Sequence, residues 1–468
     1  MSVRIKKSFQ MLGVSLAMSM SLSVSVSVLG AGQVSAQGLQ AAMEAAYENS
    51  DLLEQNRYLA RVSDEGIAQR VAALRPTLNM VAQRARTDAA GSLTETIALT
   101  ADLVLFASGS RSAQIAAARA SAEATQAQLL GLEGQVLLDA VTAYMNVWRD
   151  VQVVNVRQSN LRVVEEQLRA ARDRFDLGEA TRTDVAQAEA QMAAARSSLA
   201  AAQGTLSISR ELYQLAVGVL PEVLDAPGAR PELPASVDAA EVIARNSAPL
   251  ILAAQHEVTA NQHNLTAARA AYGPTVSMSA TSTDTREGAP NVIGNSERLS
   301  LTITQPIYQG GRLASLERTA LANLAASQSN LSRQTAIVIQ NLGNAYARLS
   351  IASAQIAANE QQINAAQLAF EGVREEASLG ARTTLDVLNA EQDLLDARIA
   401  RIQAQTDLYT ASYSVLNAMG RLTAEAMGLD VELYDADAYS ARFSGAPLGR
   451  PSVQGSRLDG VMERLGRE

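Results

Sequence analysis

The chain contains no cysteine among its 468 residues. This absence excludes a disulfide framework, a thiol nucleophile and lipidation through a cysteine, so packing alone must hold the fold. Aromatic residues are also scarce, with one Trp and five Phe. A conventional core of this length would be poorly supplied, so Ala, Leu and Val must fill the interior. Such a composition favours long helices.

Lysine is confined to positions 6 and 7, and every later cation is arginine. Beyond residue 36 the chain carries 36 cationic and 48 acidic side chains, a net charge of −12. Nucleic acids and anionic lipids are bound through a basic footprint, which this composition does not offer. We therefore predict no nucleic-acid partner.

The N-terminus has the pattern of a secretory signal peptide. Cationic residues between positions 4 and 7 precede an apolar, serine-bearing run over 9–29, and a small-residue cleavage site follows at 34–36. This pattern favours cleavage over retention as a membrane anchor. We expect residues 1–36 to be removed and the mature protein to be exported.

The two halves of the chain repeat one another. Adding 202 to a residue number in the first half lands on its counterpart in the second, and this register holds over residues 109–218. Earlier positions match at an offset of 198, so four extra residues lie between Pro274 and Gly311, and we interpret them as a longer loop. Matches at 202 include Gly109 and Gly311, Ala143-Tyr144 and Ala345-Tyr346, Asp184-Val185 and Asp386-Val387, and Gly218 and Gly420.

Each half predicts a helix, two strands, a long helix, a turn and another helix. Residues 111–176 carry apolar side chains at alternating spacings of three and four, which is helical and nearly heptad-like. Such a helix is about 100 Å long. Periodicity alone fits a plain coiled coil equally well. However, the predicted helices at 39–74 and 181–218 are each about half as long, so they can run end to end beside the long helix.

The strands predict a membrane part. Apolar residues alternate with small polar ones in segments beginning near Pro76, Leu93, Pro274 and Arg298. The same alternation describes any half-buried soluble sheet, but no 20-residue apolar helix offers another way across a membrane. We predict lipid contact for Ile97, Leu99, Leu103 and Leu301. Four strands cannot close a barrel, so several chains must share one.

Features at the two ends of these strands predict which way they face. Arg84, Arg86 and Asp88 mark the first hairpin loop and residues 284–297 a longer second one, both expected to face the cell exterior. Phe106, Tyr272 and Tyr308 lie at the other ends of the strands, where an aromatic belt is expected at the periplasmic interface. Ordinary hydrophobic caps remain an alternative reading of these three residues.

The duplicated plan resembles the TolC family of outer-membrane efflux proteins over roughly residues 39–440. The resemblance rests on motifs that occur twice, in order and in register. They are the strand-to-helix junctions Leu105-Phe106-Ala107-Ser108-Gly109 and Gln305-Pro306-Ile307-Tyr308-Gln309-Gly310-Gly311-Arg312, and the turns beginning Leu177-Gly178-Glu179-Ala180-Thr181 and Leu379-Gly380-Ala381-Arg382-Thr383. From the residues alone, each such turn is a helix stop followed by a threonine N-cap.

The resemblance implies a mainly α fold with a membrane β-barrel part. Three chains would form a homotrimer, with four strands per chain in a shared 12-stranded barrel embedded in outer-membrane lipid, and a long helical tunnel through the periplasm. Such a duct serves a tripartite efflux pump or a type I secretion system. It would dock to a periplasmic adaptor (membrane fusion) protein and an inner-membrane pump of the RND, ABC or MFS type.

The resemblance also implies roles for turn residues. The docking tips would be Leu177, Gly178, Leu379 and Gly380. A gate at the inner end of the tunnel would involve five further residues, with Arg382 pairing to Asp184 of a neighbouring hairpin. Those residues are Asp184, Arg382, Asp386, Thr183 and Asn389. Asn389 and Ala377 stand where the best-known family pattern has an acid and a latch tyrosine, which implies a weaker cation site and a looser latch.

We expect the mature chain to divide into two repeats and two shorter connecting segments. The repeats span 37–218 and 239–420, a proline-rich linker at 219–238 and residues 421–440 lie in the equatorial belt that the family has around its tunnel, and 441–468 forms a flexible tail.

Catalysis finds no support in the sequence. His256 and His263 lie about 10.5 Å apart along a predicted helix, too far to share a metal ion. There is no phosphate-binding glycine loop and no serine-triad context. We predict no catalytic residue, metal or cofactor. Two non-enzymatic alternatives are a periplasmic coiled-coil adaptor, which should have one hairpin within a β-rich domain, and a structural fibre, which should show sustained heptads without duplicated hairpins.

Overall fold

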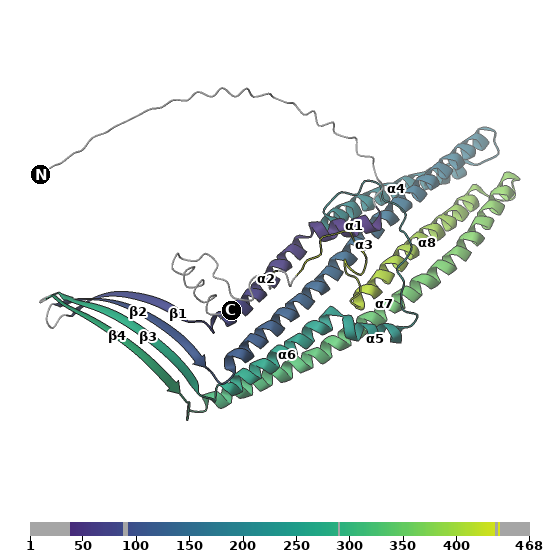
Figure 1. Ribbon diagram of the computed structural model, residues 1–468. Helices are drawn as coiled ribbons and strands as arrows, with labels where there is room; N and C mark the ends of the chain where they lie inside the picture. Colours follow the sequence, from purple (N-terminus) through teal and green to yellow (C-terminus); the bar gives the residue numbers. More distant parts are fainter. Residues whose placement is uncertain (1–37, 88–91, 289–290, 436–438, 440–468) are drawn as a thin grey trace, which may run out of the picture.

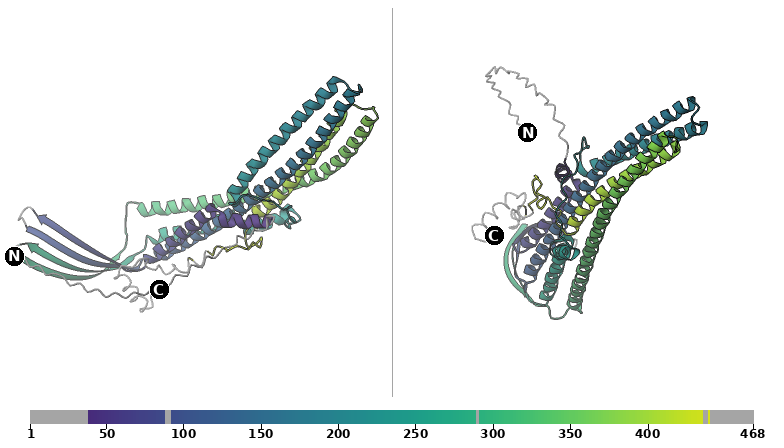
Figure 2. Two further views of the ribbon diagram at one scale, coloured as in Figure 1. Left: turned by 90° about the horizontal axis from the view of Figure 1, so that it is seen from above. Right: turned by 90° about the vertical axis from the view of Figure 1, so that its right-hand side faces the viewer.

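The computed structural model describes residues 38–87, 92–288, 291–435 and 439. The expected signal peptide, Asp88 and the expected tail lie outside them. The molecule is elongated, with a four-stranded sheet at one end and two long helical hairpins at the other (Figures 1 and 2). Among the described residues, no helix is long and apolar enough to span a bilayer.

The predicted duplication is visible in the order and length of the elements. The first half contains α1 (Leu39–Asn49), α2 (Asp51–Ala72), β1 (Thr77–Thr87), β2 (Ser92–Phe106), α3 (Ser110–Asp176) and α4 (Arg182–Val217). The second contains α5 (Val237–Ser247), α6 (Pro249–Ala270), β3 (Thr275–Gly288), β4 (Asn291–Thr304), α7 (Arg312–Ser378) and α8 (Thr384–Ala418). Helices α3 and α7 both have 67 residues. The predicted long helices and their half-length partners are therefore confirmed.

One predicted helix is divided into two. We expected a single helix over 39–74, but the structure breaks it at Ser50, whose Oγ accepts a hydrogen bond from the Leu53 amide at 3.2 Å and caps α2. The second half breaks at the equivalent place, where Pro249 occupies the first turn of α6. Serine at an N-cap and proline at the start of a helix both favour a new helix over a continuous one.

The four strands form one antiparallel sheet in the order β1-β2-β3-β4, so β1 and β4 are its edges. The second hairpin corrects our expectation of a long loop over 284–297. Both β3 and β4 continue through most of that range, with Asp284 paired to Asn295 and Ser282 to Glu297. Polar alternation continues through these residues, and charged side chains near a hairpin end do not prevent strand pairing.

The four extra residues of the second half lie elsewhere. Residues 77–106 and 275–304, which hold the two hairpins, are equal in length. By contrast, residues 107–109 connect β2 to α3, whereas residues 305–311 connect β4 to α7. The insertion therefore lengthens the strand-to-helix connection, in which Ile307 and Tyr308 are almost fully exposed.

The strand-to-helix junction of the first half is fastened to the second half. Ser108 has a positive φ of 51°, and its Oγ donates a hydrogen bond to the Pro274 carbonyl oxygen at 2.7 Å. Gly273 packs so closely against Ser108 that an added Cβ would overlap the serine side chain. This contact holds the base of β2 against the start of β3.

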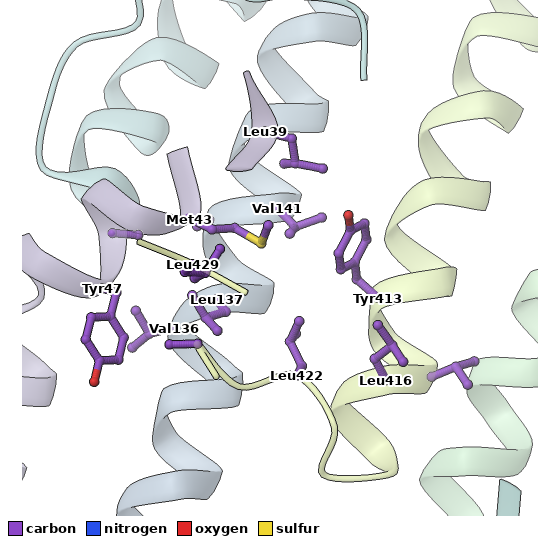
Figure 3. Packing of buried hydrophobic residues seen from close by; sticks show 14 of the residues in the cluster. Leu39, Met43, Tyr47, Val136, Leu137, Val141, Tyr413, Leu416, Leu422 and Leu429 are labelled. Atoms are coloured by element: carbon purple, nitrogen blue, oxygen red, sulfur yellow. The ribbon is translucent and has the colours of Figure 1, made fainter. Parts of the chain in front are cut away.

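The main core surrounds the middle of α3, where side chains from both halves meet. Figure 3 shows part of it from close by. The core combines side chains from both halves, including Met43 of α1, Leu137 and Val141 of α3, and Tyr413 of α8. Leu422 and Leu429 from the segment after α8 close it. Burial of apolar side chains from both halves in one cluster stabilises them jointly.

Tyrosine hydroxyl groups fasten the linker between the halves to the helices. Tyr144 of α3 is fully buried and donates to the Asp225 carbonyl oxygen at 2.8 Å. Its repeat counterpart, Tyr346 of α7, donates to the Pro234 carbonyl oxygen at 3.0 Å. Tyr409 of α8 donates to the Gly228 carbonyl oxygen at 2.7 Å. The linker thus follows the middle of the helical body.

Candidate functional site

The sheet has one apolar and one polar face. Paired residues in antiparallel strands share a face, and alternate residues point to opposite faces. The register Met80–Leu99 and Leu103–Met278–Leu301 therefore places these side chains on one side. That apolar face consists of Leu78, Met80, Ile97, Leu99, Ala101, Leu103, Met278, Ala280, Leu299, Leu301 and Ile303. All four residues predicted to contact lipid belong to it.

The opposite face is rich in hydroxyl and amide side chains. It includes Asn79, Thr100, Thr281 and Arg298, which lie side by side across the four strands. Asp102 lies on the same face, between Thr77 and Ser279. A sheet with this division separates an apolar environment from water.

Towards the hairpin ends the apolar face becomes charged. Arg84 pairs with Glu95 at 3.2 Å. Arg86, farther along β1, and Glu297, on β4, are exposed and have no ion-pair partner among the described residues of the chain. The apolar band thus ends in a belt of charge before the hairpin loops.

The two hairpin tips share one turn geometry. Gly178 and Gly380 both have φ of +78°. The Glu179 amide donates to the Arg174 carbonyl oxygen and the Ala381 amide to the Glu376 carbonyl oxygen, both at 2.8 Å. These bonds form a Schellman motif, in which glycine takes the left-handed position that other residues reach only with strain. The predicted helix stops are confirmed.

The leucines before these glycines are the exposed apolar groups of the tips. Leu177 is 74% and Leu379 78% exposed. A large apolar side chain held at the end of a rigid hairpin is available for contact with another protein.

Asp184 and Asp386 have a local role that sequence reasoning missed. Each carboxylate accepts hydrogen bonds from the backbone amide and hydroxyl of the threonine three residues before it, Thr181 or Thr383, at 2.8–3.0 Å. The threonine side chain in turn accepts from the aspartate amide. This is a complete capping box. The threonine backbone amides and hydroxyls lower the pKa of both carboxyl groups.

The remaining predicted gate residues lie near the tips. Arg382 Nε donates to Glu376 Oε2 of its own hairpin at 2.8 Å, and this partner raises the pKa of the guanidinium. Its expected contact with Asp184 of a neighbouring hairpin stays a prediction. Thr183 is exposed on the first turn of α4, and Asn389 is exposed on the second turn of α8.

Ala377, which the family resemblance implies stands in place of a latch tyrosine, is buried. It packs with Phe370, Val387 and Leu394 inside the second hairpin. This small apolar side chain contributes to the hairpin's own packing, and it has no hydroxyl with which to latch a neighbouring helix.

The two hairpins meet along α3 and α8. Asn160 Nδ2 donates to Glu391 Oε1 at 3.4 Å, and both side chains are buried. Burial raises the pKa of the Glu391 carboxyl group, while Asn160 and two arginines oppose the shift. Sequence reasoning missed this pair because its members lie 231 positions apart. The only indication in the sequence is that glutamate stands at both equivalent positions, 189 and 391. In the first hairpin, Glu189 is exposed and forms an ion pair with Arg172.

The two histidines serve no common site. His256 Nδ1 lies 2.9 Å from a carboxylate oxygen of Glu123 on α3. In the part of the chain that the structure describes, no three metal-binding side chains gather in one place.

A two-faced sheet at one end of paired helical hairpins is the architecture of a membrane channel with a long helical extension. The family model for outer membrane efflux proteins matches residues 41–218 and 242–421. The outer membrane efflux protein BepC of Brucella suis biovar 1 (strain 1330) is 37% identical over 404 residues, covering 85% of this chain and 89% of BepC. The chain therefore belongs to the outer membrane efflux protein family.

Further similarities agree with this assignment. The outer membrane protein TolC of Escherichia coli (strain K12) is 24% identical over 303 residues, covering 61% of this chain and 62% of TolC. A crystal structure of CusC matches with a TM-score of 0.73 at 20% identity, covering 82% of this chain and 92% of the CusC chain. The fold is TolC-like. The protein is an outer-membrane export channel that extends into the periplasm, and its family consists of conduits.

Proposed function

We propose that three copies of this chain form the passive exit duct of a tripartite efflux pump or a type I secretion system, and that it catalyses no reaction. The observation that supports this most strongly is the sheet. It has a continuous apolar face, a polar face and two open edges, β1 and β4. Three such sheets make the 12 strands of a shared barrel, with Ile97, Leu99, Leu103 and Leu301 towards lipid.

The helical hairpins would continue the barrel as a tunnel through the periplasm. In this arrangement the repeats 37–218 and 239–420 alternate around the axis. The segments 219–238 and 421–440 form an equatorial belt, which the tyrosine bonds to the linker support. The exposed Leu177 and Leu379 at the tips would bind a periplasmic adaptor protein, which links the duct to an inner-membrane pump.

The inner end of the tunnel would hold the gate. Three copies of Asp386 near the axis would attract cations, since each carboxyl group has a lowered pKa and stays ionised at neutral pH. Asp386→Asn should reduce the cation selectivity of reconstituted trimers and their block by divalent ions. Thr383→Ala is the matched control, because it breaks the same capping box but keeps the Asp386 carboxylate. If both variants had equal effects, the change would be due to lost capping. If neither variant changed selectivity or block, the proposed gate would be refuted.

Cell fractionation tests the duct itself. We expect the protein in the outer-membrane fraction as a trimer that dissociates on heating in detergent. A soluble periplasmic monomer would contradict the proposal.

Adaptor docking is tested by cross-linking in cells that express the cognate adaptor. Leu177→Asp and Leu379→Asp should abolish the cross-link at the tips while trimers remain. Leu368→Asp on α7 is the control, because this leucine is similarly exposed at 73% but lies about three helical turns from the tip. Loss of the cross-link in the control alone, or in none of the three variants, would place the docking surface elsewhere.

A further inference from the structure

The two edges of the sheet are complementary. Strand β1 and strand β4 run in opposite directions because three successive antiparallel pairings, through β2 and β3, connect them. Their outer backbone groups have no strand partner within the described chain. An open edge of this kind is a template for a further strand. A second copy of the chain offers an edge of the required direction, so β4 of one copy can pair with β1 of the next.

The faces restrict how the two edges can pair. On β1 the apolar face carries even-numbered residues such as Leu78 and Met80. On β4 it carries odd-numbered residues such as Leu299 and Leu301. A joint that keeps the apolar face continuous must place an even-numbered residue of β1 opposite an odd-numbered residue of β4. Because a slip of one residue turns every side chain to the other face, only registers two residues apart remain.

The uneven base of the sheet gives the direction of the stagger. Within the chain, Thr77 at the start of β1 lies level with Asp102, Ser279 and Ser300. Strand β4 continues past Ser300 to Thr304, towards the helices. For the next copy to begin its β1 at the same membrane depth, that β1 must be displaced towards the helices relative to Ser300 of β4. The longer connection over 305–311 provides extra chain after β4, which can extend alongside the displaced β1.

Charge selects the register. Arg84 already pairs with Glu95 within the chain, whereas Arg86 and Glu297 lie on the apolar face and have no ion-pair partner among the described residues. Unpaired charges on a face that meets lipid are unfavourable, so their mutual pairing is favoured. Placing Glu297 opposite Arg86 puts Ser300 opposite Gln83, a displacement of six residues from Thr77. Repeated by three copies, this stagger tilts the strands by about 45°, as membrane barrels require.

We propose that neighbouring copies join through β4 and β1 in the register that pairs Glu297 with Arg86 of the next chain. The proposal rests on the shared barrel proposed above. The ion pair closes the charged belt at each of the three joints. It fixes the register at the level where the apolar band ends.

Disulfide mapping tests the register directly, because the chain has no cysteine of its own. Val81→Cys on β1 is combined in turn with Ser300→Cys, Thr302→Cys or Thr304→Cys on β4. The proposed register places Val81 opposite Thr302, so this pair should give the most intermolecular disulfide under mild oxidation. Dominant cross-linking of either other pair overturns the register. Absence of every cross-link together with absence of trimers would instead refute the shared barrel.

Charge reversal tests the ion pair. Arg86→Glu and Glu297→Arg should each lower the temperature at which trimers dissociate in detergent, and the double variant should restore it. Arg84→Glu with Glu297→Arg is the matched control, which should give no rescue because Arg84 is paired with Glu95. Rescue by the Arg84 combination, or no rescue by the Arg86 combination, would overturn the pairing.

Discussion

Placing arginine on the two faces of β2 should have opposite consequences. Leu99 lies on the apolar face between Met80 and Ser282, whereas Thr100, one residue later, lies on the polar face between Asn79 and Thr281. An arginine on the lipid face of a barrel costs about 2–4 kcal/mol near the bilayer midplane. Leu99→Arg should therefore cost a trimer roughly 6–12 kcal/mol, since three copies contribute.

The assay compares the fraction of heat-dissociable trimer in outer membranes at equal expression. Leu99→Arg should remove most of the trimer, and Thr100→Arg should leave most of it but change the single-channel conductance in planar bilayers. Leu99→Met is the control, because it keeps an apolar side chain of similar volume and should assemble normally. If both arginine variants impaired assembly equally, the assignment of lipid and water to the two faces would be wrong.

Three further predictions concern the helical part. Gly178→Val with Gly380→Val should abolish export while trimers remain, because valine in the left-handed conformation costs about 1–2 kcal/mol at each turn. The corresponding double asparagine variant is the control and should still export. Export by the double valine variant would refute the role of the turns. Arg382→Ser should raise single-channel conductance by removing an ion pair near the proposed gate, whereas unchanged conductance in intact trimers would remove Arg382 from the gate. Because the pKa of Glu391 is raised in the folded protein, its contribution to stability is present at low pH and is lost as the pH rises through that pKa. Glu391→Gln should therefore reduce the loss of thermal stability between acidic and neutral pH, and an unchanged pH profile would contradict the assignment.

The sequence was sufficient to predict the plan of the fold. Duplication in a fixed register is visible in any sequence, and helical periodicity over 111–176 predicted α3 to within one residue at its start. The alternation of Ile97, Leu99, Ala101 and Leu103 predicted one face of β2, because strand periodicity needs no tertiary information. These patterns are local, or they repeat at a constant offset.

Features that depend on long-range contacts or on exact boundaries were harder to predict. The four-residue insertion could be bracketed between Pro274 and Gly311, but only the strand register places it after Thr304. The charged residues near Asp284 suggested a loop, although cross-strand pairing there continues. The capping role of Asp386 is a local feature, because a threonine at the N-cap and an acid three residues later form a capping box.

The shared core around the middle of α3 has a consequence for how the protein reaches its final state. Because Met43 and Leu137 of the first half pack with Tyr413 and Leu422 of the second, this shared core cannot form until almost the entire chain has arrived. A newly exported polypeptide therefore exposes the apolar side chains of this core until the second half is present. Biogenesis of this protein should thus depend on holding chaperones, and truncation shortly before residue 422 should lead to degradation rather than to a smaller functional product.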